Sequence, residues 1–129
     1  MSVKNIYELA EALTEHWSPQ VIASVNDQYI KLAKIENQLV WHTHQEEDEA
    51  FFIIKGQMKI EYKDRTVNLK EGDFHVVPKG TPHNPIAVTN SCWLMLIESK
   101  STLHTGEVQM EKTKSLQAQL LSDKVKNDY

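Results

Sequence analysis

Turn-forming residue pairs interrupt the chain at short intervals from about Val21 onward. They are Asn26-Asp27, Asn37-Gln38, Lys55-Gly56, Lys63-Asp64, Glu71-Gly72, Lys79-Gly80 and Asn90-Ser91. Some of the segments between them alternate apolar with polar residues, as Met58, Ile60 and Tyr62 alternate with the residues that separate them. Many short strands separated by regular turns are typical of an all-β antiparallel sandwich or barrel. We therefore expect an antiparallel β core.

The two ends of the chain depart from this pattern. Apolar residues recur at helical spacing near the amino terminus: Ile6, Leu9, Ala10, Leu13 and Trp17. This predicts an amphipathic helix within residues 1–19, capped by Ser2 and stopped by Ser18-Pro19. The β core is expected over residues 20–106 as one domain. Residues 107–129 form a polar tail, for which the sequence allows either a docked helix or a disordered segment.

Charge and cysteine content exclude several classes of partner. A net charge of -4 and a pI near 5.8 oppose nucleic-acid binding, because phosphate backbones select basic surfaces. The longest apolar run, residues 92–97, is far too short to span a membrane. The single cysteine, Cys92, has no intramolecular disulfide partner, and the amino terminus lacks the apolar stretch of a signal peptide. These features predict a cytoplasmic protein that binds neither nucleic acid nor membrane.

Histidines and one acidic run carry the chemistry. His42 and His44 are two residues apart in a β-forming stretch, so both imidazoles are expected to project from one face. The acidic run 46–49 and an apolar segment lead to Gly56, where a hairpin turn is expected to return a carboxylate to the histidine pair. Residues 72–83 predict a turn, a strand and a rigid turn that ends in a third histidine, His83.

These segments resemble the two motifs of the cupin superfamily, G-x5-H-x-H-x3/4-E-x6-G and G-x5-P-x-G-x2-H-x3-N. The first is matched by His42, His44, Glu49 and Gly56, and the second by Gly72, Pro78, Gly80 and His83. The resemblance covers roughly residues 21–100. Glu36 stands where the first motif opens with Gly, and Ala87 where the second closes with Asn. The resemblance therefore implies nothing about the loop geometry at these two outer positions.

The resemblance implies a jelly-roll β-barrel in which His42, His44, Glu49 and His83 are the metal ligands. Three neutral imidazoles and a carboxylate suit Fe, Mn, Ni, Cu or Zn, and leave positions for water, dioxygen or a chelating substrate. Because histidine must lose its proton to bind, metal affinity is expected to fall below roughly pH 6. The alternative is a barrel without an ion, which the presence of all four ligands disfavours.

Other residues compete for roles near this site. Asp48 is a rival ligand, but the spacing to Gly56 favours Glu49, because a shift of one residue along a strand turns the carboxylate to the opposite face. His75 lies in the middle of a predicted strand, where we favour a role other than metal ligand. Phe51 shares its parity with Glu49 and is expected to face the cavity.

Three functions are open. The first is a small-molecule metalloenzyme of oxygenase or isomerase type, and the chain is similar to cupins called phosphomannose-isomerase-like. A phosphosugar isomerase would need cations in the barrel, whereas Arg65 is the single arginine and Lys59 is expected to face outward. The second is a non-catalytic module that binds or senses a small ligand. A third possibility is an ion that only stabilises the fold. Cupins commonly pair through exposed strands, so we expect a homodimer.

Overall fold

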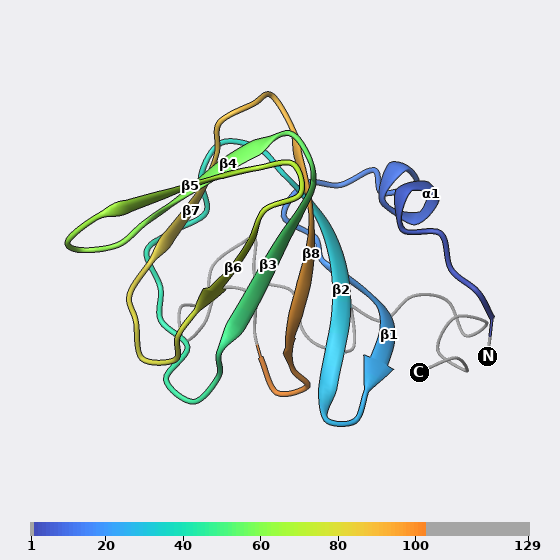
Figure 1. Cartoon of the computed structure of the whole chain (residues 1–129), viewed down its shortest axis with the longest axis horizontal. Coiled ribbons are helices and arrows are strands. Elements are labelled where there is room, and N and C mark those ends of the chain that lie inside the picture. Colours follow the sequence, from blue (N-terminus) through green and yellow to red (C-terminus); the bar gives the residue numbers. More distant parts are fainter. Residues whose placement is uncertain (1, 103–129) are drawn as a thin grey trace.

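The computed structural model describes residues 2–102 of the chain. Within this range one helix precedes the strands, which form two antiparallel sheets (Figure 1). The elements are α1 (Ile6–Glu11), β1 (Gln20–Val25), β2 (Gln28–Ile35), β3 (Glu49–Lys55), β4 (Gln57–Glu61), β5 (Thr66–Lys70), β6 (Phe74–Val77), β7 (Asn84–Ala87) and β8 (Cys92–Ser99). The larger sheet has the order β1-β2-β8-β3-β6, and the smaller sheet has the order β5-β4-β7. The predicted all-β antiparallel class is thus confirmed.

The main core combines the inward-facing residues of both sheets. It contains Ile35 and Phe51 from the larger sheet and Met58 and Ile60 from the smaller one, all buried. Cys92 belongs to the same core and is fully buried, as expected of a packed residue. The described strands form two separate hydrogen-bonded sheets and do not close into one continuous barrel, which corrects the expectation of a closed β-barrel.

Gly56 is the point where the chain passes from one sheet to the other. β3 pairs with β6 and β8, whereas β4 pairs with β5 and β7, so the expected β3–β4 hairpin at Gly56 is wrong. Gly56 has φ 86°, a left-handed conformation, and a Cβ there would lie 2.6 Å from the carbonyl oxygen of Ser91. Only glycine fits this corner without strain. A turn signal in a sequence marks a change of direction and does not identify the strand's partner.

The helix α1 is shorter than the helix predicted over residues 1–19. It starts after Asn5, whose side-chain oxygen accepts a hydrogen bond from the backbone N–H of Glu8 at 3.0 Å, so Asn5 takes the capping role expected of Ser2. Ala10 is the buried residue of α1 and belongs to a second core cluster on the outer face of the larger sheet. Figure 1 shows α1 outside this sheet, near β2.

Tertiary contacts end the helical pattern before Ser18-Pro19. Lys34 on β2 donates its ammonium hydrogens to the carbonyls of Glu11 and Leu13, at 3.0 and 2.7 Å. Trp17 adopts a positive φ of 56°, and its backbone N–H donates to the carbonyl of Lys34 at 2.8 Å. The Trp17 ring is buried in the main core, where a continued helix would not place it. Trp17, which suggested another helical turn, therefore packs in the core of the sheets instead.

The polar tail at 107–129 lies outside the described residues, and its structure stays a prediction. Among residues 2–102, none of the helical structure is long and apolar enough to cross a membrane.

Candidate metal centre

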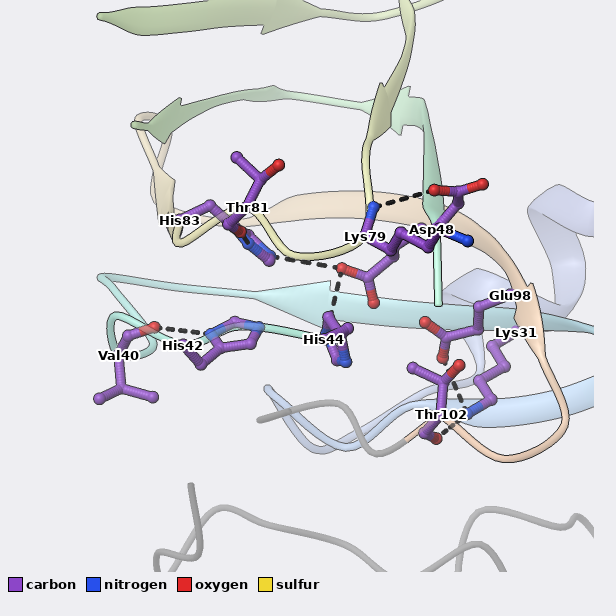
Figure 2. A network of polar contacts seen from close by, with 11 residues as sticks. Lys31, Val40, His42, His44, Asp48, Lys79, Thr81, His83, Glu98 and Thr102 are labelled. Carbon is purple, nitrogen blue, oxygen red and sulfur yellow. Dashed lines mark hydrogen bonds and ion pairs between the residues drawn. The ribbon is translucent and has the colours of Figure 1, made fainter. Parts of the chain in front are cut away.

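Four side chains converge inside the molecule from three segments of the chain. The ligand atoms of His42, His44, Glu49 and His83 all lie within 4.8 Å of one another, and all four side chains are buried. Figure 2 shows the three histidines gathered around one region, with His83 opposite His42 and His44. The structure therefore brings together the four residues that the sequence motifs single out.

A backbone bridge fixes His42 against His83. The N–H of His42 donates to the carbonyl of His83, and the N–H of His83 donates to the carbonyl of His42, both at 3.0 Å. Residues paired in this way have neighbouring side chains on one face of the sheet. Their ring centroids accordingly lie 4.4 Å apart. The stretch that holds His42 and His44 is extended but belongs to none of the named strands, so this isolated bridge positions it.

The backbone also decides which nitrogen His42 and His83 offer. Nδ1 of His42 lies 2.7 Å from the carbonyl oxygen of Val40, and Nδ1 of His83 lies 2.9 Å from that of Thr81 (Figure 2). A carbonyl can only accept, so Nδ1 carries the hydrogen and Nε2 keeps its lone pair. Both Nε2 atoms are buried and have no hydrogen-bond partner in the described part of the chain. A metal ion would satisfy them, and hydrogen bonds to Nδ1 are what orient histidine ligands.

Glu49, the first residue of β3, supplies the one carboxylate of the cluster. Its Oε1 lies 3.7 Å from Nε2 of His44 and 3.6 Å from Nε2 of His83. Nitrogen and oxygen atoms at such separations can share one ion of the first transition series. Glu49 reaches the site because its side chain faces the core, in the same parity as Phe51 and Ile53 on this strand.

Burial shifts the titration of these groups. Burial, together with the nearby imidazole of His83, lowers the pKa of His42 to about 4. Burial likewise lowers the pKa of His83 and raises the pKa of the Glu49 carboxyl. At neutral pH both imidazoles are therefore unprotonated and available as ligands. A buried anion at Glu49 needs compensation, which a divalent cation would supply.

Asp48, the rival carboxylate, has a different role. Its Oδ1 accepts a hydrogen bond from the backbone N–H of Lys79 at 2.9 Å (Figure 2). One residue further, the N–H of Gly80 donates to the carbonyl of His44 at 2.7 Å. These two bonds attach the turn that precedes His83 to the segment that carries His44. Asp48 thus lies outside the cluster and helps to hold its two halves together.

An apolar cavity opens beside the cluster. His42 and Glu49 line it together with Phe51, Met58 and Leu96, so Phe51 faces the cavity as its parity predicted. Its remaining lining residues are Trp17, Pro19, Ala33, Ile35, Leu39, Pro85 and Leu94. No lysine or arginine of residues 2–102 is among them, so the described lining offers no positive charge to a phosphate.

A family model described as a cupin domain matches residues 29–97 of the chain. The chain belongs to the cupin family. A cupin-2 domain containing protein from Shewanella frigidimarina NCIMB 400 is 39% identical, with a TM-score of 0.73 over 75% of this chain and 94% of that chain. Protein NMB1881 from Neisseria meningitidis is 31% identical, with a TM-score of 0.69 over 76% of this chain and 99% of that chain. The two antiparallel sheets of this cupin accordingly fit a jelly-roll.

Curated relatives add a weaker link to chemistry. The uncharacterized protein YdbB of Bacillus subtilis is 34% identical over 82 residues, which cover 63% of this chain and 73% of YdbB. A 3-hydroxyanthranilate 3,4-dioxygenase 2 of Aspergillus fumigatus is 30% identical over 77 residues, 55% of this chain. The matched part of this cupin spans only 40% of that dioxygenase's length.

A buried charged pair beside the cluster was missed by the sequence analysis. Lys31 on β2 and Glu98 on β8 are both fully buried, and Nζ of Lys31 lies 2.8 Å from Oε1 of Glu98. The signal lies in the strand parity, because Lys31 continues the inward series of Ala33 and Ile35. Glu98 similarly continues the inward series of Leu94 and Leu96. A charged residue in an inward position marks a function or a partner.

His75 on β6 lies outside the metal cluster in this cupin. Its Nε2 lies 2.7 Å from the hydroxyl oxygen of Tyr62, which defines a hydrogen bond between the two side chains. The ring of Tyr62 in turn lies 6.5 Å from that of His83, between centroids. His75 is therefore a neighbour of the site and pairs with a tyrosine.

Proposed function

We propose that this cupin binds one divalent transition-metal ion through His42, His44, Glu49 and His83. The observation that carries the proposal is the pair of buried Nε2 atoms, on His42 and His83, that have no hydrogen-bond partner among residues 2–102 and lie close to a buried carboxylate. Three imidazoles with one carboxylate suit Fe, Mn, Ni, Cu or Zn. When bound, such an ion would act as a Lewis acid or, if iron, as a centre for dioxygen chemistry.

We further propose that the protein is a metal-dependent enzyme of oxygenase type that acts on a small apolar organic molecule. Support comes from the apolar cavity that includes His42 and Glu49 in its wall, and from the partial likeness to a dioxygenase. Because a dioxygenase places both atoms of O2 in its substrate, the substrate supplies all the electrons and no further reductant is needed.

The phosphosugar-isomerase alternative has less support. Lys59 lies between Met58 and Ile60, whose side chains enter the core, so Lys59 points to the other face of β4. Arg65 lies over the Tyr62 ring and is absent from the cavity lining. Without a cation among the described lining residues, a phosphate group in this cavity would have no charged partner there, which is costly.

The residues of the chain have distinct tasks in this proposal. The carbonyls of Val40 and Thr81 hold two imidazoles in the orientation that binds. The apolar walls exclude water, which strengthens electrostatic interactions between the ligands, the ion and a bound molecule. Phe51 lies in the wall next to Glu49 in the inward parity of β3, where it can contact the substrate and orient it.

Oxygen consumption tests the enzymatic proposal. The protein would be loaded with Fe(II) without air and mixed with O2 and a panel of small uncharged aromatic molecules. Substrate-dependent uptake of O2, with both atoms of labelled O2 in the product, is expected for wild type and not for His83→Ala. Tight binding of a probe without turnover would instead favour the non-catalytic binding module.

A further inference from the structure

Three charged side chains stand in a row on the inner face of the larger sheet. Lys31, Glu98 and Glu49 lie on β2, β8 and β3, which are consecutive neighbours in that sheet. Glu49 and Glu98 are direct register partners, and Lys31 lies diagonally from Glu98, since it pairs with Leu96. All three side chains are buried: 0% exposed for Lys31 and Glu98, and 3% for Glu49. Inner faces of sheets are otherwise apolar, so this row needs a reason.

Contacts connect the row from end to end. Nζ of Lys31 lies 2.8 Å from Oε1 of Glu98 and donates to the carbonyl of Thr102 at 3.4 Å (Figure 2). Glu98 and Glu49 are directly paired across β8 and β3 on the same inner face, so their buried carboxyl groups are neighbours. Figure 2 shows Lys31 and Glu98 at one side of the histidine group. Glu98 therefore lies directly beside Glu49 on the sheet, and Lys31 fixes the position of Glu98.

The stability of the fold alone does not account for the Lys31–Glu98 pair. A buried ion pair loses so much hydration that apolar residues of similar size often give an equal or greater stability. The neighbouring strands already fill the core with apolar side chains, among them Leu94 and Leu96 on β8 itself. The presence of Lys31 and Glu98 at these inward positions is explained if the two residues orient the neighbouring Glu49 carboxylate.

We propose that Glu98, anchored by Lys31, is a positioning residue that orients the Glu49 carboxylate toward the metal ion. This inference rests on the proposed metal site and assigns that site a supporting layer beyond its ligands. Groups that orient a metal ligand typically contribute about 10-fold to 100-fold to metal affinity. Glu98 itself is not assigned as a metal ligand, because it lies outside the four-residue cluster and its carboxyl is paired with Lys31.

Metal titration of Glu98 variants, with affinity measured by competition against a chromophoric chelator, tests the proposal. Glu98→Gln can accept from Lys31 through its amide oxygen and has an amide N–H to offer Glu49, so its affinity is expected to stay within about threefold of wild type. Glu98→Ala leaves Glu49 unsupported, and its affinity is expected to fall about 10-fold to 100-fold. A loss in Glu98→Gln as large as in Glu98→Ala would overturn the positioning role.

A double variant separates positioning from folding. Lys31→Met with Glu98→Leu replaces the pair by apolar side chains, so the protein is expected to stay folded, with a melting temperature near that of wild type. Its metal affinity is nevertheless expected to fall about 10-fold or more. The control is Leu32→Ala on the outer face of β2, which loses stability but retains wild-type affinity.

The outcomes distinguish this inference from the proposed function. If wild type binds no metal, the proposed site fails and the inference fails with it. If wild type binds metal, and the folded double variant or folded Glu98→Ala binds it equally well, the site stands and the positioning role is wrong.

Discussion

Two backbone carbonyls, those of Val40 and Thr81, determine the chemistry of the site at the scale of single residues. They fix the hydrogen of each imidazole on Nδ1, so that Nε2 of His42 and Nε2 of His83 point their lone pairs inward. Burial then keeps both rings neutral by lowering their pKa values. The expected loss of metal below roughly pH 6 assumed an ordinary imidazole pKa. Loss of metal through protonation of these two rings is therefore expected only at lower pH.

Glu49 becomes a main source of proton competition at the metal. Its pKa is raised by burial, so falling pH protonates it before His42, whose pKa is about 4. Protonation removes the negative charge that binds the ion, so metal affinity is expected to decrease as the pH falls through the range in which Glu49 takes up its proton. In Glu49→Gln the logarithm of affinity should change less steeply with pH, by up to about one proton per ion. Equal slopes for the two proteins would contradict this assignment.

At the scale of elements, strand parity positions the site. Alternation along β3 and β8 turns Glu49 and Glu98 inward together with the core residues of the same strands. The four candidate ligands could be predicted from sequence because these positions match the two cupin motifs. The Lys31–Glu98 pair was not predicted, because charged residues on strands are usually exposed. The end of α1 and the change of sheet at Gly56 depend on contacts distant in sequence, which local patterns do not contain.

A pair of glycine substitutions tests the corner between the sheets. Gly56 and Gly72 have nearly the same conformation, with φ 86° and 87°, but a Cβ at Gly72 would meet nothing within 4 Å. Gly72→Ala should therefore lose only the cost of a left-handed conformation, about 1–2 kcal/mol. Gly56→Ala adds a clash with Ser91, so it should lose at least about 1 kcal/mol more. Urea unfolding of both variants measures the difference, and equal losses would show that the corner is not tightly packed.

At the scale of the whole molecule, the metal ion would hold together segments from both motifs. Since a buried carboxylate and unpartnered imidazole nitrogens burden the metal-free protein, binding should stabilise the native state. At a free metal concentration of 100 times Kd, the gain is about 2.7 kcal/mol. We expect a corresponding rise in Tm by calorimetry, and no rise in His83→Ala. A Tm that metal leaves unchanged in wild type would argue against a specific site.

The homodimer stays a prediction at this scale. β6 is at one end of the larger sheet, and its outward-facing residues Phe74 and Val76 are 58% and 42% exposed. Pairing would cover such an edge and protect it from aggregation. Sedimentation velocity at micromolar concentration should show a dimer, and a single monomeric species would contradict the expectation.

The metal content of the purified protein tests the central claim most directly. Protein prepared without chelators would be analysed for transition metals, alongside His42→Ala, His83→Ala and the control His75→Ala, which changes a neighbouring histidine outside the cluster. We predict about one ion per chain in wild type and in His75→Ala, and a loss of at least about 10-fold in affinity in the other two. A wild type without metal, or site variants that retain as much as wild type, would contradict the account.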